Sequence, residues 1–163
     1  MNELSLFSGI GGGCLASVIL GHRIIGYVEA DHAARAVLKA RIADGLLDPA
    51  PIFGDIRRFL GGGWAERYRG LAELVSGGFP CPSFSVAGKR LGSRDERNMW
   101  PAMLECVRAI EPAYVFAENV PGLLTSTDPD SGEPHFGRIL ADLSELGYGV
   151  EWMVLGADDL GAT

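Results

Sequence analysis

Short apolar runs alternate with helical patterns along most of the chain, and this alternation restricts the fold more than any other feature. We expect strands at Glu3–Ser8, Ile24–Glu29, Pro51–Phe53, Leu74–Ser76, Tyr114–Glu118 and Gly149–Leu155. We expect helices at Gly12–Leu20, His32–Ala43, Met99–Ile110 and Phe136–Leu146, with Asp31 as the N-cap of the second one. Strands that are separated by helices are typical of a parallel sheet with crossover connections, so the sequence predicts an α/β fold.

Two segments interrupt this order. Residues 59–70 contain a glycine run and are expected to form a loop that enters a short helix. Residues 125–136 are polar and rich in turn-forming residues. Either segment could be a solvated surface loop and nothing more.

Composition narrows the class of protein. The length of 163 residues favours one domain, and a content of 47% hydrophobic and 21% charged residues is ordinary for a soluble protein. No apolar run is long enough to span a membrane, and the first residues lack the basic region of a secretory signal.

Three widely spaced cysteines suit neither a disulfide framework nor a zinc site, and the histidines lack metal-like spacing. We therefore expect a protein of a reducing cytoplasm with no metal, while the net charge of −7 argues against a simple nucleic-acid binder.

Residues with functional chemistry follow the expected strands. The strands are followed, in chain order, by the turn Phe7–Gly12, by Glu29 and Asp31, by Asp55, by Cys81, and by Glu118 with Asn119. In open α/β sheets, ligands bind outside the carboxyl ends of the strands. The sequence therefore predicts an active site at that edge of the sheet.

The first turn predicts a nucleoside cofactor. Its glycines would let the backbone approach a ligand closely at a helix N-terminus, but Cys14 stands where the dinucleotide fingerprint requires its third glycine. A cofactor without a pyrophosphate therefore fits better. Glu29 could accept hydrogen bonds from ribose hydroxyls, and Asp55 could accept one from an adenine amino group. The alternative is a tight strand–helix turn without a ligand.

The stretch "SGGFPCPSFS" (residues 76–85) places Cys81 between two prolines and after two glycines. Proline restricts the backbone and glycine permits sharp turns, so the thiol would sit on a stiff, turned segment. A thiolate is a strong nucleophile, and the carboxylic acid of Glu118 can donate or hold a proton. This pair suits attack on an electron-poor ring whose nitrogen is protonated or hydrogen-bonded at the same time. The alternatives are an incidental cysteine in a proline-rich loop and a carboxylate at a sheet edge.

The motifs "LFSGIGGG", "EAD", "GDI", "GGFPCPSFSVAGKR", "DERN" and "ENVPGLL" resemble, in this order, those of the DNA cytosine-5 methyltransferases. The resemblance runs from about Leu4 to the end of the chain. It implies a Rossmann-like fold with a mostly parallel sheet and helices on both faces, S-adenosylmethionine as the cofactor, and a cytosine flipped out of double-stranded DNA. It also implies a prokaryotic or phage-encoded restriction-modification enzyme.

The resemblance further implies roles for matching residues. Cys81 would attack C6 of cytosine, Glu118 would engage N3, Pro80 would shape the base pocket, and Asn119 would complete the catalytic group. The cofactor would contact Phe7, Gly9, Ile10, Gly11, Gly12, Glu29, Ala30, Asp55, Ile56 and Phe79. The DNA would contact Ser85, Lys89, Arg90, Arg94 and Arg97. We expect Cys14 and Cys106, which fall within expected helices, to be core residues.

Two departures from the family bear on activity. Pro82 stands where glutamine usually follows the cysteine, and "LGADDLGAT" stands where an arginine-rich motif normally follows. We therefore expect residues 1–163 to form a partial catalytic domain without the target-recognition region, inactive or incomplete alone. A separate carboxyl-terminal half or a second copy of the chain would then be a partner. A non-catalytic adenosylmethionine-binding or partner-binding remnant and an RNA cytosine-5 methyltransferase remain alternatives.

Overall fold

The computed structural model describes residues 1–80, 98–128, 131–156, 159 and 161. Contacts within the chain divide it into two compact units. The first comprises Met1–Cys81 with Glu96–Asn119, and the second comprises Pro82–Asp95 with Val120–Thr163. The five strands lie in the first unit, which therefore carries most of the expected site.

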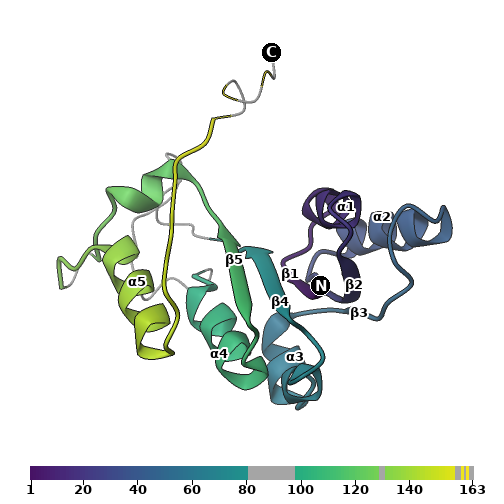
Figure 1. Cartoon of the computed structure of the whole chain (residues 1–163), viewed down its shortest axis with the longest axis horizontal. Helices are drawn as coiled ribbons and strands as arrows, with labels where there is room; N and C mark the ends of the chain where they lie inside the picture. Colours follow the sequence, from purple (N-terminus) through teal and green to yellow (C-terminus); the bar gives the residue numbers. More distant parts are fainter. Residues whose placement is uncertain (81–97, 129–130, 157–158, 160, 162–163) are drawn as a thin grey trace. The chain divides into compact units, whose positions relative to one another are not determined.

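The first unit is built on a sheet of five parallel strands in the order β3-β2-β1-β4-β5 (Figure 1). The strands are β1 (Asn2–Leu6), β2 (Arg23–Val28), β3 (Ile52–Phe53), β4 (Leu74–Gly78) and β5 (Tyr114–Glu118). This arrangement confirms the predicted parallel α/β sheet. The chain begins in the middle of the sheet, extends it outward through β2 and β3, and then crosses back past β1 to add β4 and β5.

Helices separate the strands, as the sequence predicts. Those of the first unit are α1 (Gly12–Ile19), α2 (His32–Ala43), α3 (Ile56–Gly61) and α4 (Trp100–Ile110), with a 3-10 segment at Ala65–Tyr68. The second unit contains a 3-10 segment at Pro121–Leu124 and α5 (His135–Glu145). Among the described residues, every helix is too short or too polar to span a bilayer.

The two faces of the sheet are covered by different helices. Tyr27 is fully buried on one face, in a cluster that includes Cys14 of α1 and Leu38 of α2. Its neighbour Gly26 points to the other face, where a Cβ atom would collide with the hydroxyl of Tyr68. Because successive residues of a strand point to opposite faces, this pair shows that the sheet is covered on both sides.

One expectation is wrong, and a second is wrong in part. Gly149–Leu155 is not a strand in the structure, and the side chains of Trp152 and Met153 are 58% and 78% exposed. Alternating apolar residues satisfy the side-chain pattern of a strand, but a strand also needs a neighbour for its backbone hydrogen bonds. The loop expected from residue 59 begins later, because residues 59–61 are the end of α3, which begins at Ile56 where the Asp55 carboxylate caps it. The short helix expected after this loop is present as the 3-10 segment Ala65–Tyr68.

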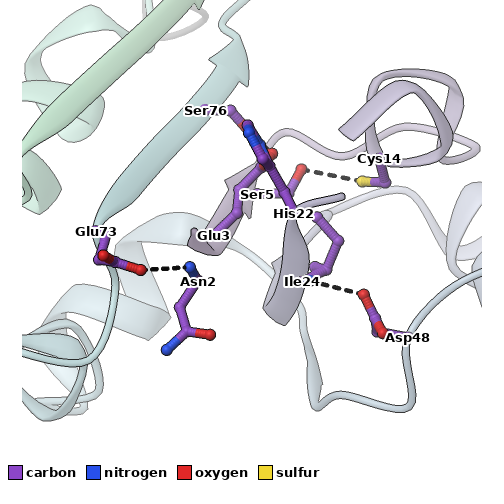
Figure 2. A network of polar contacts seen from close by, with 9 residues as sticks. All are labelled: Asn2, Glu3, Ser5, Cys14, His22, Ile24, Asp48, Glu73 and Ser76. Carbon is purple, nitrogen blue, oxygen red and sulfur yellow. Dashed lines mark hydrogen bonds and ion pairs between the residues drawn. The ribbon is translucent and has the colours of Figure 1, made fainter. Parts of the chain in front are cut away.

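A buried carboxylate joins three segments of the first unit (Figure 2). Glu3 of β1 is 1% exposed, and its Oε1 accepts a 2.5 Å hydrogen bond from the hydroxyl of Ser76 in β4. Its Oε2 lies 3.2 Å from Nδ1 of His22, in the turn before β2. On the same strand, Ser5 accepts a 3.2 Å hydrogen bond from the thiol of Cys14. These polar contacts therefore stabilise the centre of the sheet in addition to the apolar core.

Ser76→Ala should lower the free energy of unfolding by about 1.5–3 kcal/mol, because it removes a donor from a buried charged acceptor. Ser8→Ala is the matched control. The Ser8 hydroxyl donates to the neutral carbonyl of Ser5 at 3.0 Å, so its loss should cost only about 0.5–1.5 kcal/mol. Urea denaturation of both variants measures the difference. A Ser76→Ala cost no larger than that of Ser8→Ala would contradict this role of Glu3.

Candidate active site

The parallel register brings the carboxyl ends of the strands to one edge of the sheet. Leu6 pairs with Val28 of β2 and with Gly77 of β4, and Val28 pairs with Phe53 of β3. The residues that follow these strands are those that the sequence assigns to the cofactor. The structure therefore gathers the predicted cofactor residues of the first unit at one edge.

The turn after β1 is held in a restricted backbone conformation. Phe7, Gly9 and Gly11 have positive φ angles of 51°, 55° and 93°. A positive φ is unfavourable for a bulky residue such as phenylalanine, and strained residues of this kind cluster at ligand sites. Gly11 caps α1, and a Cβ atom there would lie 2.9 Å from Cδ1 of Leu47. The positive φ therefore favours glycine at position 11, and a larger residue there would also displace the side chain of Leu47.

The outer side of the same turn is open. A Cβ atom on Gly9, Gly12 or Gly13 would meet no atom within 4 Å. Ile10, between these glycines, is 66% exposed. The turn can therefore approach a ligand closely without a side chain in the way.

Glu29 links the first turn to the second. Its Oε2 accepts a 2.7 Å hydrogen bond from the backbone N–H of Gly9, and its Oε1 accepts one of 2.7 Å from the N–H of Asp31. Each carboxylate oxygen keeps a second lone pair, so the group can still accept from a hydroxyl. The sequence placed Glu29 after the second strand, but it did not reveal that Glu29 organises the glycine turn.

The two aspartates at this edge cap helices. Asp31 Oδ1 accepts from the N–H of Ala34 at 2.7 Å, which confirms the predicted N-cap of α2. Asp55 Oδ1 accepts from the N–H of Arg57 at 2.7 Å and so begins α3. The capping role of Asp55 was missed, although an aspartate before an apolar helical pattern is a usual signal for it.

Two further cofactor candidates differ in exposure. Ala30 is exposed beside Glu29, whereas the side chain of Ile56 is only 3% exposed and belongs to the core. Ile56 therefore offers its backbone, not its side chain, to a ligand.

The segment that leads to Cys81 is held through its backbone. The side-chain amide of Asn119 donates a 2.9 Å hydrogen bond to the carbonyl of Phe79. The N–H of Met99 donates to the carbonyl of Pro80 at 3.2 Å. The ring of Phe79 is buried and packs 5.3 Å from the ring of Trp100, measured between centroids. Two residues before the predicted nucleophile, the chain is thus fixed to the segment after β5 and to the start of α4.

The side chain of Glu118 in β5 lies against Gly78 of the neighbouring strand β4. Glu118 pairs with Gly78, and a Cβ atom on Gly78 would lie 2.8 Å from Oε2 of Glu118. The carboxylate therefore occupies space that exists because residue 78 is glycine. Glu118 is exposed, so its carboxylate is accessible to a ligand. The structure brings Glu118 and Asn119 to the segment Gly78–Phe79 that precedes Cys81 in the chain.

Several predicted site residues lie outside the described part of the chain. These are the nucleophile candidate Cys81 and the DNA-contact candidates Ser85, Lys89, Arg90, Arg94 and Arg97. Among the described residues, no group of three or more histidines, cysteines or acidic side chains is arranged to hold a metal ion.

The other two cysteines are core residues, as predicted. Cys14 is 2% exposed and Cys106 is fully buried. Burial raises the pKa of the Cys14 thiol and raises that of Cys106 to about 12. Since the thiolate is the nucleophile, neither residue is activated for chemistry at neutral pH.

Iodoacetamide at pH 8 should therefore leave Cys14 and Cys106 unmodified in the folded protein, because both raised pKa values keep the thiols protonated and both side chains are buried. In urea all three cysteines should react. Peptide mass spectrometry after timed quenching distinguishes the sites. Rapid modification of Cys106 in the folded chain would contradict the burial and the raised pKa of its thiol.

A family model for C-5 cytosine-specific DNA methylases matches residues 1–163. The type II methyltransferase M.NgoMIV of Neisseria gonorrhoeae is 34% identical over 161 residues, which cover 99% of this chain and 47% of that protein. The orphan methyltransferase M.SPRI of Bacillus phage SPR is 32% identical over 161 residues, covering 96% of this chain and 34% of that protein. The chain thus spans about half the length of M.NgoMIV and about a third of M.SPRI.

A solved structure shares the fold. A candidate DNA modification methyltransferase encoded within a prophage of E. coli superimposes with a TM-score of 0.62 at 23% identity. The match covers 89% of this chain and 38% of that chain. It supports the methyltransferase-type fold that the sequence motifs imply.

Proposed function

Because this chain belongs to the C-5 cytosine-specific DNA methylase family, we propose that it takes part in methyl transfer from S-adenosylmethionine to C5 of a flipped-out cytosine in double-stranded DNA. It would supply the cofactor-binding and nucleophile part of the catalytic domain. The observation that carries the proposal is the hydrogen bond from Asn119 to the carbonyl of Phe79. It joins the "ENV" motif to the segment that ends in Cys81, and so joins the two motifs that the chemistry needs.

The residues at the sheet edge fit the cofactor. The open side of the glycine turn leaves room for the adenosine and methionine parts, and the Glu29 carboxylate can accept from ribose hydroxyls. Asp55 retains an oxygen, Oδ2, that could accept from the adenine amino group while Oδ1 caps α3. The sulfonium of adenosylmethionine supplies the reactive methyl group, so the protein mainly contributes position.

Cys81 and Glu118 would activate the base. The Cys81 thiolate forms a bond to C6 while N3 receives a proton or hydrogen bond from Glu118, which makes C5 nucleophilic. After C5 accepts the methyl group, a base removes the C5 proton and the electrons of that bond expel Cys81. Asn119 holds the backbone that carries the nucleophile, which makes it a positioning residue in this scheme.

A covalent adduct tests the assignment of Cys81. Duplex DNA that contains 5-fluorocytosine should trap the protein in a band resistant to denaturant, because fluorine cannot leave as a proton does. Adenosylmethionine is supplied, with and without the carboxyl-terminal part of M.NgoMIV that lies beyond the matched region. Cys81→Ser should abolish the band, whereas Cys14→Ser, which removes a buried thiol, should retain it.

The result separates the alternatives. An adduct that survives Cys81→Ser would exclude Cys81 as the nucleophile. Adduct formation with fluorinated RNA and not with DNA would favour an RNA substrate. Cofactor binding without any adduct in either mixture would favour a non-catalytic adenosylmethionine-binding protein.

DNA binding should depend strongly on salt although the chain is acidic overall, with a net charge of −7. If Lys89, Arg90, Arg94 and Arg97 meet phosphates, the slope of log K against log salt should be about −3.6, from about −0.9 for each contact. Fluorescence anisotropy with labelled duplexes measures the slope. Replacing all four residues by glutamine should bring it close to zero, and a slope that stays near −3.6 in that variant would place the phosphate contacts elsewhere.

A further inference from the structure

Arg35 of α2 reaches over the carboxyl end of β2. Its Nη1 donates to the carbonyl of Glu29 at 2.9 Å and to the carbonyl of Ala30 at 2.6 Å. This nitrogen carries two hydrogens, so the two carbonyls use both of them. The same atom lies 3.8 Å from the position that a Cβ atom would occupy on Gly54, at the end of β3. One guanidinium nitrogen therefore reaches the ends of two neighbouring strands.

Arg35 binds the carbonyls of Glu29 and Ala30, and these peptide groups set the direction of the Glu29 side chain. The N–H of Glu29 donates to the carbonyl of Phe53 at 3.1 Å, which fixes one side of the residue to β3. Arg35 fixes the other side through the carbonyl. With both peptide groups held, the carboxylate stays where it accepts from Gly9 and Asp31. Without Arg35, the carbonyls of Glu29 and Ala30 would lose these donors and the turn could rotate.

The positive charge of Arg35 also stabilises this arrangement. Glu29, Asp31 and Asp55 bring three carboxylates to this edge of a chain with a net charge of −7. Hydrogen bonds from a guanidinium are charge-assisted, and the two hydrogens of Nη1 lie in the plane of the group at fixed directions. Arg35 is itself partly buried, which reduces screening of the charge by water. The cation therefore contributes both orientation and favourable electrostatics.

We propose that Arg35 is a positioning residue for the cofactor, which holds Glu29 in the orientation that receives the ribose. This inference rests on the proposed function. Arg35 need not contact the cofactor in this arrangement, because its effect passes through the peptide groups of Glu29 and Ala30. The inference predicts that Arg35 and Glu29 act as one unit in cofactor affinity.

A double-mutant cycle tests this dependence. Calorimetry with S-adenosylhomocysteine is performed on the wild type, Arg35→Gln, Glu29→Gln and the double variant. Arg35→Gln should weaken binding about tenfold, the equivalent of about 1.4 kcal/mol. The double variant should bind as Glu29→Gln does, because Arg35 has nothing left to position. Additive losses in the double variant, or an unchanged affinity of Arg35→Gln, would overturn the inference.

Arg41→Gln provides a matched control on the same helix. Arg41 forms an exposed 2.9 Å ion pair with Asp44 near the end of α2. The same substitution there removes one charge and one contact without touching Glu29, so affinity should not change. Arg35→Lys keeps the charge but lacks the planar guanidinium, and it should bind between the wild type and Arg35→Gln.

Amide hydrogen exchange supplies a readout that needs no cofactor. The N–H groups of Gly9 and Asp31, which donate to Glu29, should exchange faster in Arg35→Gln than in the wild type or in Arg41→Gln. Unchanged exchange at both amides would overturn the inference whatever the affinity. A wild type that fails to bind S-adenosylhomocysteine would overturn the proposed cofactor and the affinity effect together. Exchange that is unchanged while the wild type binds would overturn the role of Arg35 alone.

Discussion

The carboxylate of Glu29 joins the backbone turn after β1 to the turn after β2. It accepts from Gly9 after β1 and from Asp31 after β2, both at 2.7 Å. The glycine turn, the start of α2 and the edge of the sheet are therefore connected through one side chain. A ligand at this edge would meet a surface whose backbone donors and acceptors are already oriented, which reduces the entropy lost on binding.

The site is built mainly by backbone contacts, and glycines provide the space for them. A Cβ atom on Gly77 would lie 2.8 Å from the carbonyl oxygen of Leu6, so glycine allows β1 and β4 to approach. A Cβ atom on Gly78 would meet the carboxylate of Glu118. The two glycines before "FPC" thus serve different purposes, since one permits the sheet and the other permits the position of an acid. Asn119 then fixes Phe79 from the side of β5.

Much of this arrangement could be predicted from the sequence. The bounds His32–Ala43 and Tyr114–Glu118 agree with the structure, and Asp31 caps its helix as expected. These features are local, because periodicity and capping depend on residues that are close in the chain. The strand expected at Gly149–Leu155 does not form. Its alternating pattern is local, but a strand also needs another segment whose backbone accepts and donates its hydrogen bonds.

The sequence by itself determined the alternation of strands and helices from β1 to β5, the burial of Cys14 and Cys106, and the set of residues that follow the strands. The tertiary structure decided which of those residues touch. The contact of Glu29 with Gly9 spans 20 positions, and that of Asn119 with Phe79 spans 40. The register of β1 against β2 and of β4 against β5 sets both contacts. Register depends on hydrogen bonds and packing between distant segments, so no spacing within a single motif reveals it.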